Sequence, residues 1–488
     1  MMKTRIATTM KTPFFWISLL AMCILLANSG MAMEFEAGDA GKMTISGKAQ
    51  AAFGGTQYLD FVDNNSKGDD ADFDATREIS LKFTWEYDPQ LKTVLSFQIG
   101  EGSTGGYFGS TDALVGGEED GDLILELDNL YIDYTTDFGL NLKLGSQSYN
   151  LSEIAYGSHI MYEVPAGVTA SYPINERTSI SAGWFRFADL MDDTDHNTSD
   201  QADFLFAKLG ADLGGFKLTP WIAFANIEED VVKYEVEDGD TVNNYTRYAY
   251  FDYPTLIGET NGLGIGDANP TDAVTAYYLG LKLDFNPSDL LSIQASGTYG
   301  DMDWETATED ITIAGYFFDL VVDYNAGFAT PEFFAFYGNG PDDNDNDIDM
   351  MPVLIGGPTY TSSYFGGSRY NDNMFDSYDS TYATSMWAVG FKLKDIKTAE
   401  WASHEFQFMY AEGLADDSIF EAPDDILLND DESLMEFNFN STFQLRKHLV
   451  FATELGYIIF DEDSDYDEAA NGSVEDMWKV ACSFEFTF

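Results

Sequence analysis

The sequence contains little cysteine and few basic residues, and each shortage excludes a class of protein. The two cysteines are Cys23 and Cys482, and Cys23 lies in an N-terminal segment that we expect to be removed. The mature chain therefore cannot form an intramolecular disulfide. The 24 Lys and Arg residues are outnumbered by 84 Asp and Glu residues, which gives a net charge of −60. Such acidity excludes a nucleic-acid binder that works by neutralising phosphates.

Long apolar runs and catalytic motifs are missing as well. After the N-terminal segment no apolar run approaches about 18 residues, so no membrane-spanning helix is expected there. The glycines of residues 262–266 lack the spacing of a phosphate-binding loop. The four histidines do not stand in a motif for nucleophilic catalysis: His159, His196, His404 and His448. We therefore do not expect an enzyme.

The N-terminal segment has the features of a secretory signal peptide. Lys3, Arg5 and Lys11 precede an apolar run from Phe14 to Ala27, and small residues follow in Gly30-Met31-Ala32. This order predicts a signal peptide over residues 1–32 and one mature domain over residues 33–488. Acylation at Cys23 is the weaker alternative, because apolar residues continue beyond that cysteine.

Aromatic residues are abundant, and apolar residues alternate with polar ones in many short segments. The 28 Tyr, 38 Phe and 8 Trp residues exclude intrinsic disorder. From Ile79 to Tyr87 every second residue is apolar, which is the pattern of a β-strand with one polar face. We place 18 such segments, beginning near Lys42, Arg77, Leu91, Leu123, Leu140, Gly167, Thr178, Asp203, Phe216, Ala273, Leu290, Ile311, Phe328, Met386, Trp401, Leu434, Leu449 and Met477. The segments at Gly167 and Thr178 alternate least clearly, so a count of 16 stays open.

The connections between these segments alternate between short and long. Turn residues make short connections at residues 88–90, 214–215, 286–289 and 325–327. Every intervening connection is expected to be longer, as at residues 55–76, 101–122, 228–272, 338–385 and 412–433. Membrane β-barrels have this asymmetry, with short periplasmic turns at one rim and long extracellular loops at the other.

The polar face of the predicted strands carries many lysines. Alternation alone does not separate a soluble sandwich from a membrane barrel, in which apolar side chains face lipid and polar ones line a wet lumen. Aromatic residues such as Tyr87 and Phe285 lie beside short turns, as in the interfacial girdle of a membrane protein. We therefore expect an all-β, closed antiparallel transmembrane β-barrel of 16–18 strands in a Gram-negative outer membrane. Its lumen-facing basic residues would be Lys48, Lys82, Lys92, Lys143, Lys208, Lys282 and Lys392.

The chain ends in an aromatic strand that resembles an outer-membrane insertion signal. Phe484, Phe486 and Phe488 stand at alternate positions, although Ser483 replaces the usual glycine. This resemblance implies recognition by the barrel-assembly machinery during insertion into outer-membrane lipid.

Several short motifs resemble those of a known family. They are ISGK at residues 45–48, LGSQ at 144–147 and FYGNG at 336–340, followed by an acidic loop. Together with the terminal Phe488, these motifs resemble the trimeric general porins of Gram-negative bacteria, and most of all the porins of sulfate-reducing bacteria. The resemblance covers nearly all of the mature chain. The resemblance implies a homotrimer, passive diffusion of ions and small hydrophilic solutes, and a third loop folded inward to narrow the pore.

The third long connection, from about Gln147 to Ala166, is the candidate constriction. If it folds inward, Glu153, His159 and Glu163 would set the charge of the narrowest point. It mixes polar and aromatic residues and lacks the acidic runs of the other loops. An ordinary surface loop is the alternative.

Two features leave the transported solute open. Acidic residues crowd the long connections, which would attract cations to the mouth, whereas the lumen lysines would attract anions. The runner-up function is a substrate-specific 18-stranded channel, for example for sugars or small acids. Its signature would be an aromatic track, and Phe204, Phe206 and Phe317 are aromatic on the inward face. The alternative is that these rings pack beneath a folded loop.

An acidic tract is the candidate for metal binding. Asp343, Asp345, Asp347 and Asp349 stand at alternate positions, and Ca²⁺ takes six to eight oxygen ligands. The tract lacks the glycine and the distal Glu of an EF-hand. Ca²⁺ at this extracellular loop is one hypothesis and a solvated acidic loop is the other; no other cofactor is expected.

Overall fold

The computed structural model describes most of the predicted barrel. The described residues are 32–36, 38, 41–57, 62–63, 71–100, 124–151, 156–189, 201–229, 235–237, 240–242, 270–307, 309–341, 346–354, 357–365, 367–369, 384–416, 428–461 and 473–488. The predicted signal peptide lies outside them apart from Ala32. Among these residues no helix is long and apolar enough to cross a membrane.

Eighteen antiparallel strands form one closed barrel. All 18 predicted segments are strands, so the count of 16 is wrong. The barrel strands are β2 (Lys42–Gln57), β4 (Ala71–Asp88), β5 (Leu91–Gly100), β6 (Ile124–Thr135), β7 (Asn141–Ser146), β10 (Ala166–Asn175), β11 (Thr178–Asp189), β12 (Gln201–Asp212), β13 (Phe216–Ile227), β16 (Val274–Ser288), β17 (Leu291–Glu305), β18 (Asp310–Tyr324), β19 (Thr330–Gly338), β21 (Met386–Ala399), β22 (Ala402–Gly413), β23 (Ser433–Arg446), β24 (Leu449–Asp461) and β26 (Met477–Thr487). Short strands outside this series are β1 (Met33–Glu36), β3 (Val62–Asp63), β8 (Tyr149–Asn150), β9 (Tyr162–Glu163), β14 (Glu235–Glu237), β15 (Asp240–Val242), β20 (Asp347–Ile348) and β25 (Ser473–Val474).

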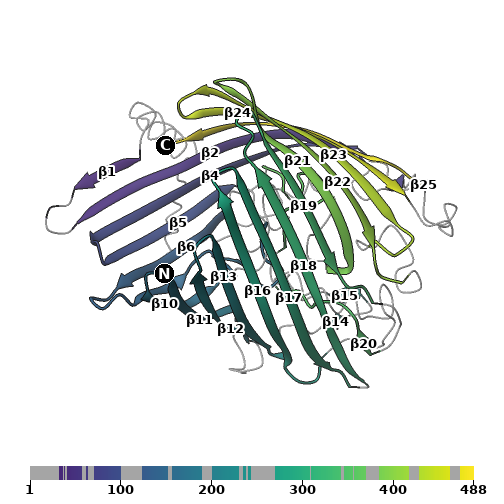
Figure 1. The fold of residues 1–488 in the computed structure, drawn as a ribbon, viewed down its shortest axis with the longest axis horizontal. Coiled ribbons are helices and arrows are strands. Elements are labelled where there is room, and N and C mark those ends of the chain that lie inside the picture. Colours follow the sequence, from purple (N-terminus) through teal and green to yellow (C-terminus); the bar gives the residue numbers. More distant parts are fainter. Residues whose placement is uncertain are drawn as a thin grey trace, which may run out of the picture.

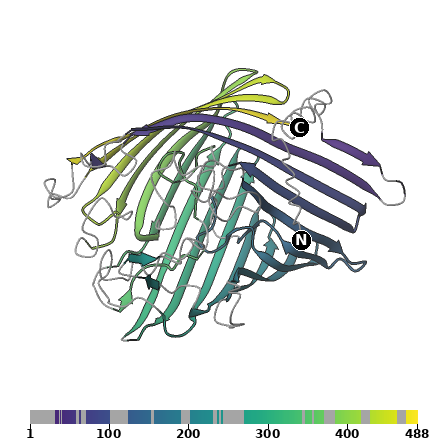
Figure 2. The same ribbon diagram turned by 180° about the vertical axis from the view of Figure 1, so that it is seen from behind.

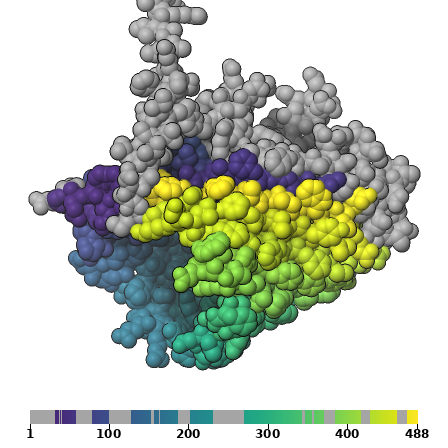
Figure 3. Space-filling view, turned by 90° about the horizontal axis from the view of Figure 1, so that it is seen from above, coloured from purple at the N-terminus to yellow at the C-terminus, as the bar shows by residue number. Residues whose placement is uncertain are grey.

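The first and last barrel strands close the sheet. β26 pairs with β2 from Lys48↔Thr487 to Gln57↔Trp478. Figures 1 and 2 show the purple first strand along the yellow last ones, and Figure 3 shows the same seam from above. Beyond the end of β26, the backbone of Phe488 exchanges hydrogen bonds of 2.8 and 3.0 Å with Gly47. β1 then continues the row by pairing with the first residues of β2.

The two faces of the wall are sorted as a membrane barrel requires. On β16, Leu279 is 60% exposed whereas its neighbour Tyr278 is 3% exposed. Leu281 and Tyr277 are exposed with Leu279, and Lys282 lies on the opposite face. Exposed apolar side chains of this kind recur around the barrel, so the surface offered to the surroundings is one that lipid stabilises.

The short connections gather at one rim, with one departure from the predicted alternation. β17 and β18, which we expected to be joined by a longer loop, are connected by residues 306–309 alone, where the Thr306 amide donates to the Glu309 carbonyl at 2.8 Å. The prediction of a longer loop is wrong here because β17 continues to Glu305 and β18 begins at Asp310. Met302 and Trp304 are buried on the inward face, so pairing continues to Glu305↔Asp310.

Candidate channel interior

The described parts of the third loop, residues 147–151 and 156–165, lie against the inside of the barrel wall. The Tyr149 ring centroid is 4.9 Å from that of Phe185 on β11 and 4.7 Å from that of Phe206 on β12. His159 is fully buried, with its ring 4.4 Å from Phe317 on β18. The inward aromatic residues of the wall thus pack beneath a folded loop and do not form an open track.

The described parts of the seventh connection, residues 339–341, 346–354, 357–365, 367–369 and 384–385, also fold inward, which sequence reasoning missed. They are called the seventh loop below. Its segment 361–364 is bound to Glu436, a fully buried carboxylate on β23. This carboxylate accepts the Thr361 hydroxyl at 2.6 Å and the amides of Ser363 and Tyr364 at 3.0 and 3.3 Å. Burial and the nearby carboxylates of Glu432 and Glu436 raise the pKa of Tyr364, so its phenol stays protonated. The signal in the sequence was the row of inward polar residues on β22 and β23. A carboxylate buried there needs hydrogen-bond donors, and an inward loop can supply them.

A buried ion pair holds the next part of the seventh loop. Lys479 on β26 lies 3.0 Å from the Glu454 carboxylate on β24, and both side chains are almost completely buried. Lys479 also donates to the Ser362 carbonyl. Glu454 in turn accepts the Ser368 hydroxyl and the Arg369 amide, each at 2.8 Å. The loop is therefore attached to three neighbouring strands by charged hydrogen bonds, which are the strong kind.

The two inward loops are bonded to each other and to one ionic cluster of the wall. The Leu354 amide donates to the His159 carbonyl at 3.0 Å, and the Thr359 amide to the Tyr156 carbonyl at 3.2 Å. The Tyr156 hydroxyl donates to Glu332 on β19. Glu332 also contacts Lys392 and Lys394 of β21, and the Lys392 ammonium lies 3.9 Å from the centre of the Tyr156 ring. The described parts of the two loops are therefore bonded to each other and fixed to the inner wall.

The predicted lumen lysines lie opposite the exposed apolar face and divide into two groups. Lys48, Lys92 and Lys392 form ion pairs with Glu78, Asp133 and Glu332. Within the described residues the other group has no ion pair, although two of its members lie over the rings of Tyr131 and Tyr149. This unpaired group consists of Lys82, Lys143, Lys208 and Lys282.

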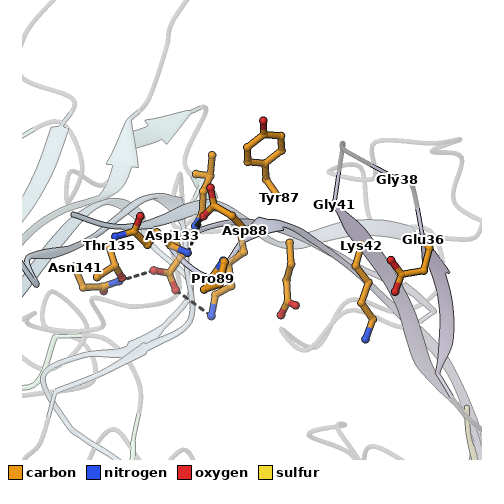
Figure 4. A pocket seen from close by; sticks show the side chains of 14 residues that line it. Glu36, Gly38, Gly41, Lys42, Tyr87, Asp88, Pro89, Asp133, Thr135 and Asn141 are labelled. Carbon is orange, nitrogen blue, oxygen red and sulfur yellow. Dashed lines mark hydrogen bonds and ion pairs between the residues drawn. The ribbon is translucent and has the colours of Figure 1, made fainter. Parts of the chain in front are cut away.

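A ladder of alternating charge borders the inner rim near the short turns. The paired positions run Glu36↔Lys42, Lys42↔Glu86, Glu86↔Lys92, Lys92↔Asp133 and Asp133↔Lys143. These strands line a pocket of about 560 Å³. In Figure 4 the side chains of Tyr87 and Lys42 point in opposite directions. Asp133 accepts Asn141 at 2.6 Å and Lys92 at 3.2 Å. Opposite charges in register stabilise the strand pairing here.

A second pocket, of about 330 Å³, lies under the seventh loop. Glu405, Gln407, Asn440 and Thr442 line it together with Arg369, which donates to Thr442 at 2.9 Å. Carboxylates, amides and a guanidinium thus share this space below the loops, and a polar solute can be hydrogen-bonded there.

The remaining predicted site residues lie in several places. Glu153, Asp343 and Asp345 fall outside the described residues, as does the side chain of Glu163. Asp347 and Asp349 are exposed, and within the described ranges no group of three or more His, Cys, Asp and Glu residues is placed to hold a metal. Of the terminal aromatics, Phe484 is exposed on the outer face, and Phe486 and Phe488 stack at 6.0 Å.

No family model matches the sequence, and no curated protein matches it. Solved structures share the fold at low identity. OccK9 (OpdG) of Pseudomonas aeruginosa is 11% identical, with a TM-score of 0.51 over 91% of this chain and 98% of that chain. OccAB2 of Acinetobacter baumannii is 10% identical, with a TM-score of 0.51 over the same shares. A BenF-like porin of Pseudomonas fluorescens Pf-5 is 10% identical, with a TM-score of 0.50 over 91% of this chain and 99% of that chain.

These likenesses agree with the strand count, the closure of β26 on β2 and the apolar outer face. The resemblance to porins of sulfate-reducing bacteria and the homotrimer stay predictions. The chain is an 18-stranded antiparallel β-barrel with the fold of Gram-negative outer-membrane porins.

Proposed function

We propose that the protein is a substrate-selective outer-membrane channel for small organic acids. The observation that carries this proposal is that two anchored loops narrow the barrel, while four lysines of its inner wall have no ion pair among the described residues: Lys82, Lys143, Lys208 and Lys282. A narrowed lumen makes a solute touch the wall, and unpaired ammonium groups favour a negatively charged solute there.

This proposal replaces the general diffusion pore as the first choice. A general pore needs an open lumen, whereas the buried ion pair of Lys479 and Glu454, called the latch below, holds the seventh loop inside the barrel. The lysines also argue for anions in the lumen, against the cation preference expected from the acidic mouth. Sugars remain the alternative solute class, because the pocket under the seventh loop offers amides and hydroxyls.

Single-channel recording in a planar bilayer tests the proposal. Under a salt gradient the reversal potential should show anion preference, and small organic acids should reduce the ionic current in a saturable way. Lys208→Gln with Lys282→Gln should weaken both effects about ten-fold, whereas Lys208→Arg with Lys282→Arg should retain them. Cation preference with current that rises linearly with salt and is insensitive to acids would contradict the proposal.

The same recordings test the predicted assembly. A homotrimer should close in three equal steps, and independent barrels should close in single steps. Heat-modifiable migration on gels serves as the control, because it reports that the barrel is folded before its conductance is judged.

A further inference from the structure

Two neighbouring short turns concentrate basic charge at one rim of the barrel. Lys397 lies beside the turn between β21 and β22, and Arg446 and Lys447 lie at the turn between β23 and β24; all three are exposed. Glu400 is the acidic residue of the first turn and is exposed too. No other short turn of the described chain carries two adjacent basic residues, although the whole sequence has a net charge of −60.

The two turns are joined into one surface. The Gln444 amide donates to the Trp401 carbonyl at 2.7 Å, and the side chain of Gln444 donates to the Arg446 carbonyl. The Trp401 ring, which is 56% exposed, lies 6.0 Å from the ring of Phe443. Basic groups and an exposed amphipathic ring are therefore held side by side, and such rings favour the headgroup level of a membrane.

A polar contact on the outer face marks where the lipid-facing band ends. His404 lies between Phe439 and Phe443, at ring distances of 5.7 and 5.8 Å. Its ring nitrogens contact the hydroxyls of Thr398 and Ser441, each at 2.8 Å. Polar side chains on the outer face are stabilised at the interface and not in the hydrocarbon, so the basic turns just beyond lie at headgroup depth.

We propose that this surface binds the headgroup of an anionic phospholipid in the periplasmic leaflet. Arg446 and Lys447 would contact the phosphate, and Trp401 and Phe443 would pack beside the glycerol and upper acyl chains. Lys397 pairs with Ser403, which lies on the lumen face, and is not part of the site. Within the described residues neither Arg446 nor Lys447 has an ion pair, so their charges are available to a ligand. The inference is independent of which solute the channel carries.

Native mass spectrometry of the full-length, detergent-purified protein tests it, with phosphatidylglycerol and phosphatidylcholine as probes. Wild type should retain phosphatidylglycerol preferentially, and Arg446→Gln with Lys447→Gln should weaken that retention about ten- to thirty-fold, since each basic residue at a membrane surface contributes about 1 kcal/mol. The matched control is Arg177→Gln with Lys217→Gln, which removes the same charge elsewhere near the rim and should change retention less than about two-fold.

Two results would overturn the inference. One is equal loss in the two double variants, which would show that only overall charge matters. The other is wild-type protein that retains phosphatidylcholine as well as phosphatidylglycerol. Heat-modifiable migration of each variant must show a folded barrel, and retention should fall as salt is raised, because surface charges are screened.

Discussion

The inner wall differs between the arc formed by β2, β4, β5, β6 and β7 and the arc that runs from β11 to β24. In the first arc most inward side chains are polar, and charges of opposite sign face each other across strands, as Lys92 and Asp133 do. In the second arc the inward side chains include Phe185, Phe204 and Phe334, all fully buried beneath the inward loops. The inner wall of the barrel therefore has one part that faces solvent and one part that packs like the core of a soluble protein.

The comparison shows that a side chain can point into this barrel without being polar. Period-two alternation decides which residues share a face, but the composition of the inward face depends on what covers it. Where loops cover the wall, aromatic side chains stabilise the loops by removing apolar surface from water. Where nothing covers it among the described residues, ion pairs and amides hold the strands in register.

Removing the latch of the covered arc should have the largest effect. Lys479→Met leaves the buried Glu454 carboxylate without its cation, which costs roughly 3–5 kcal/mol of unfolding free energy. Urea unfolding of the protein in lipid vesicles measures this loss of unfolding free energy. Lys42→Met, whose partner Glu34 is exposed, is the control and should show no measurable loss. The combined change of Glu454 and Lys479 to Met should recover more than half of the loss; failure to recover would mean that the pair itself is not the latch.

A charge placed on the lipid face should have the next largest effect. Leu279→Lys puts an ammonium group on the exposed apolar side of β16 and should lower the unfolding free energy by about 2–4 kcal/mol, as measured by urea unfolding in vesicles. Thr84→Lys, on the inward face of the polar arc, should cost less than half as much. Equal costs would mean that the two faces are not separated between lipid and lumen.

Loss of one hydrogen bond of the third loop should have the smallest effect. Tyr156→Phe keeps the ring under Lys392 but removes the hydroxyl that donates to Glu332, at a cost of about 1.5–3 kcal/mol. Current noise in bilayer recordings should increase as the loop loosens. Tyr172→Phe, on the outer face, should leave both the unfolding free energy and the noise unchanged. Unchanged noise in both variants would argue that Tyr156 does not hold the loop.

Much of the fold could be predicted from the sequence, and the reasons are local. The alternation from Ile79 to Tyr87 and the turn residues at 88–90 depend only on near neighbours, so β4, β5 and their connection were confirmed. The longer loop predicted between β17 and β18 was wrong, because Met302 and Trp304 are held in strand by the inward core that covers them. The inward position of the third loop came from a family resemblance, and its constriction residues stay a prediction.

The seventh loop shows what sequence patterns miss. Its acidic, glycine-containing sequence is typical of a surface loop, and the carboxylate that binds it, Glu436, lies on a strand about seventy residues away. Likewise Lys392, which forms an ion pair, and Lys282, which has none among the described residues, stand in the same local sequence pattern. Only the neighbouring strands decide which ammonium group meets a carboxylate.

The sequence by itself determined that the chain is an all-β barrel with apolar residues on one face, because side-chain alternation and turn chemistry are local properties of the backbone. The tertiary structure alone decided which loops enter the barrel, which inward lysines meet a carboxylate and which turns bring their basic residues together. These properties depend on contacts between residues far apart in the chain, whose register is set only when the barrel closes.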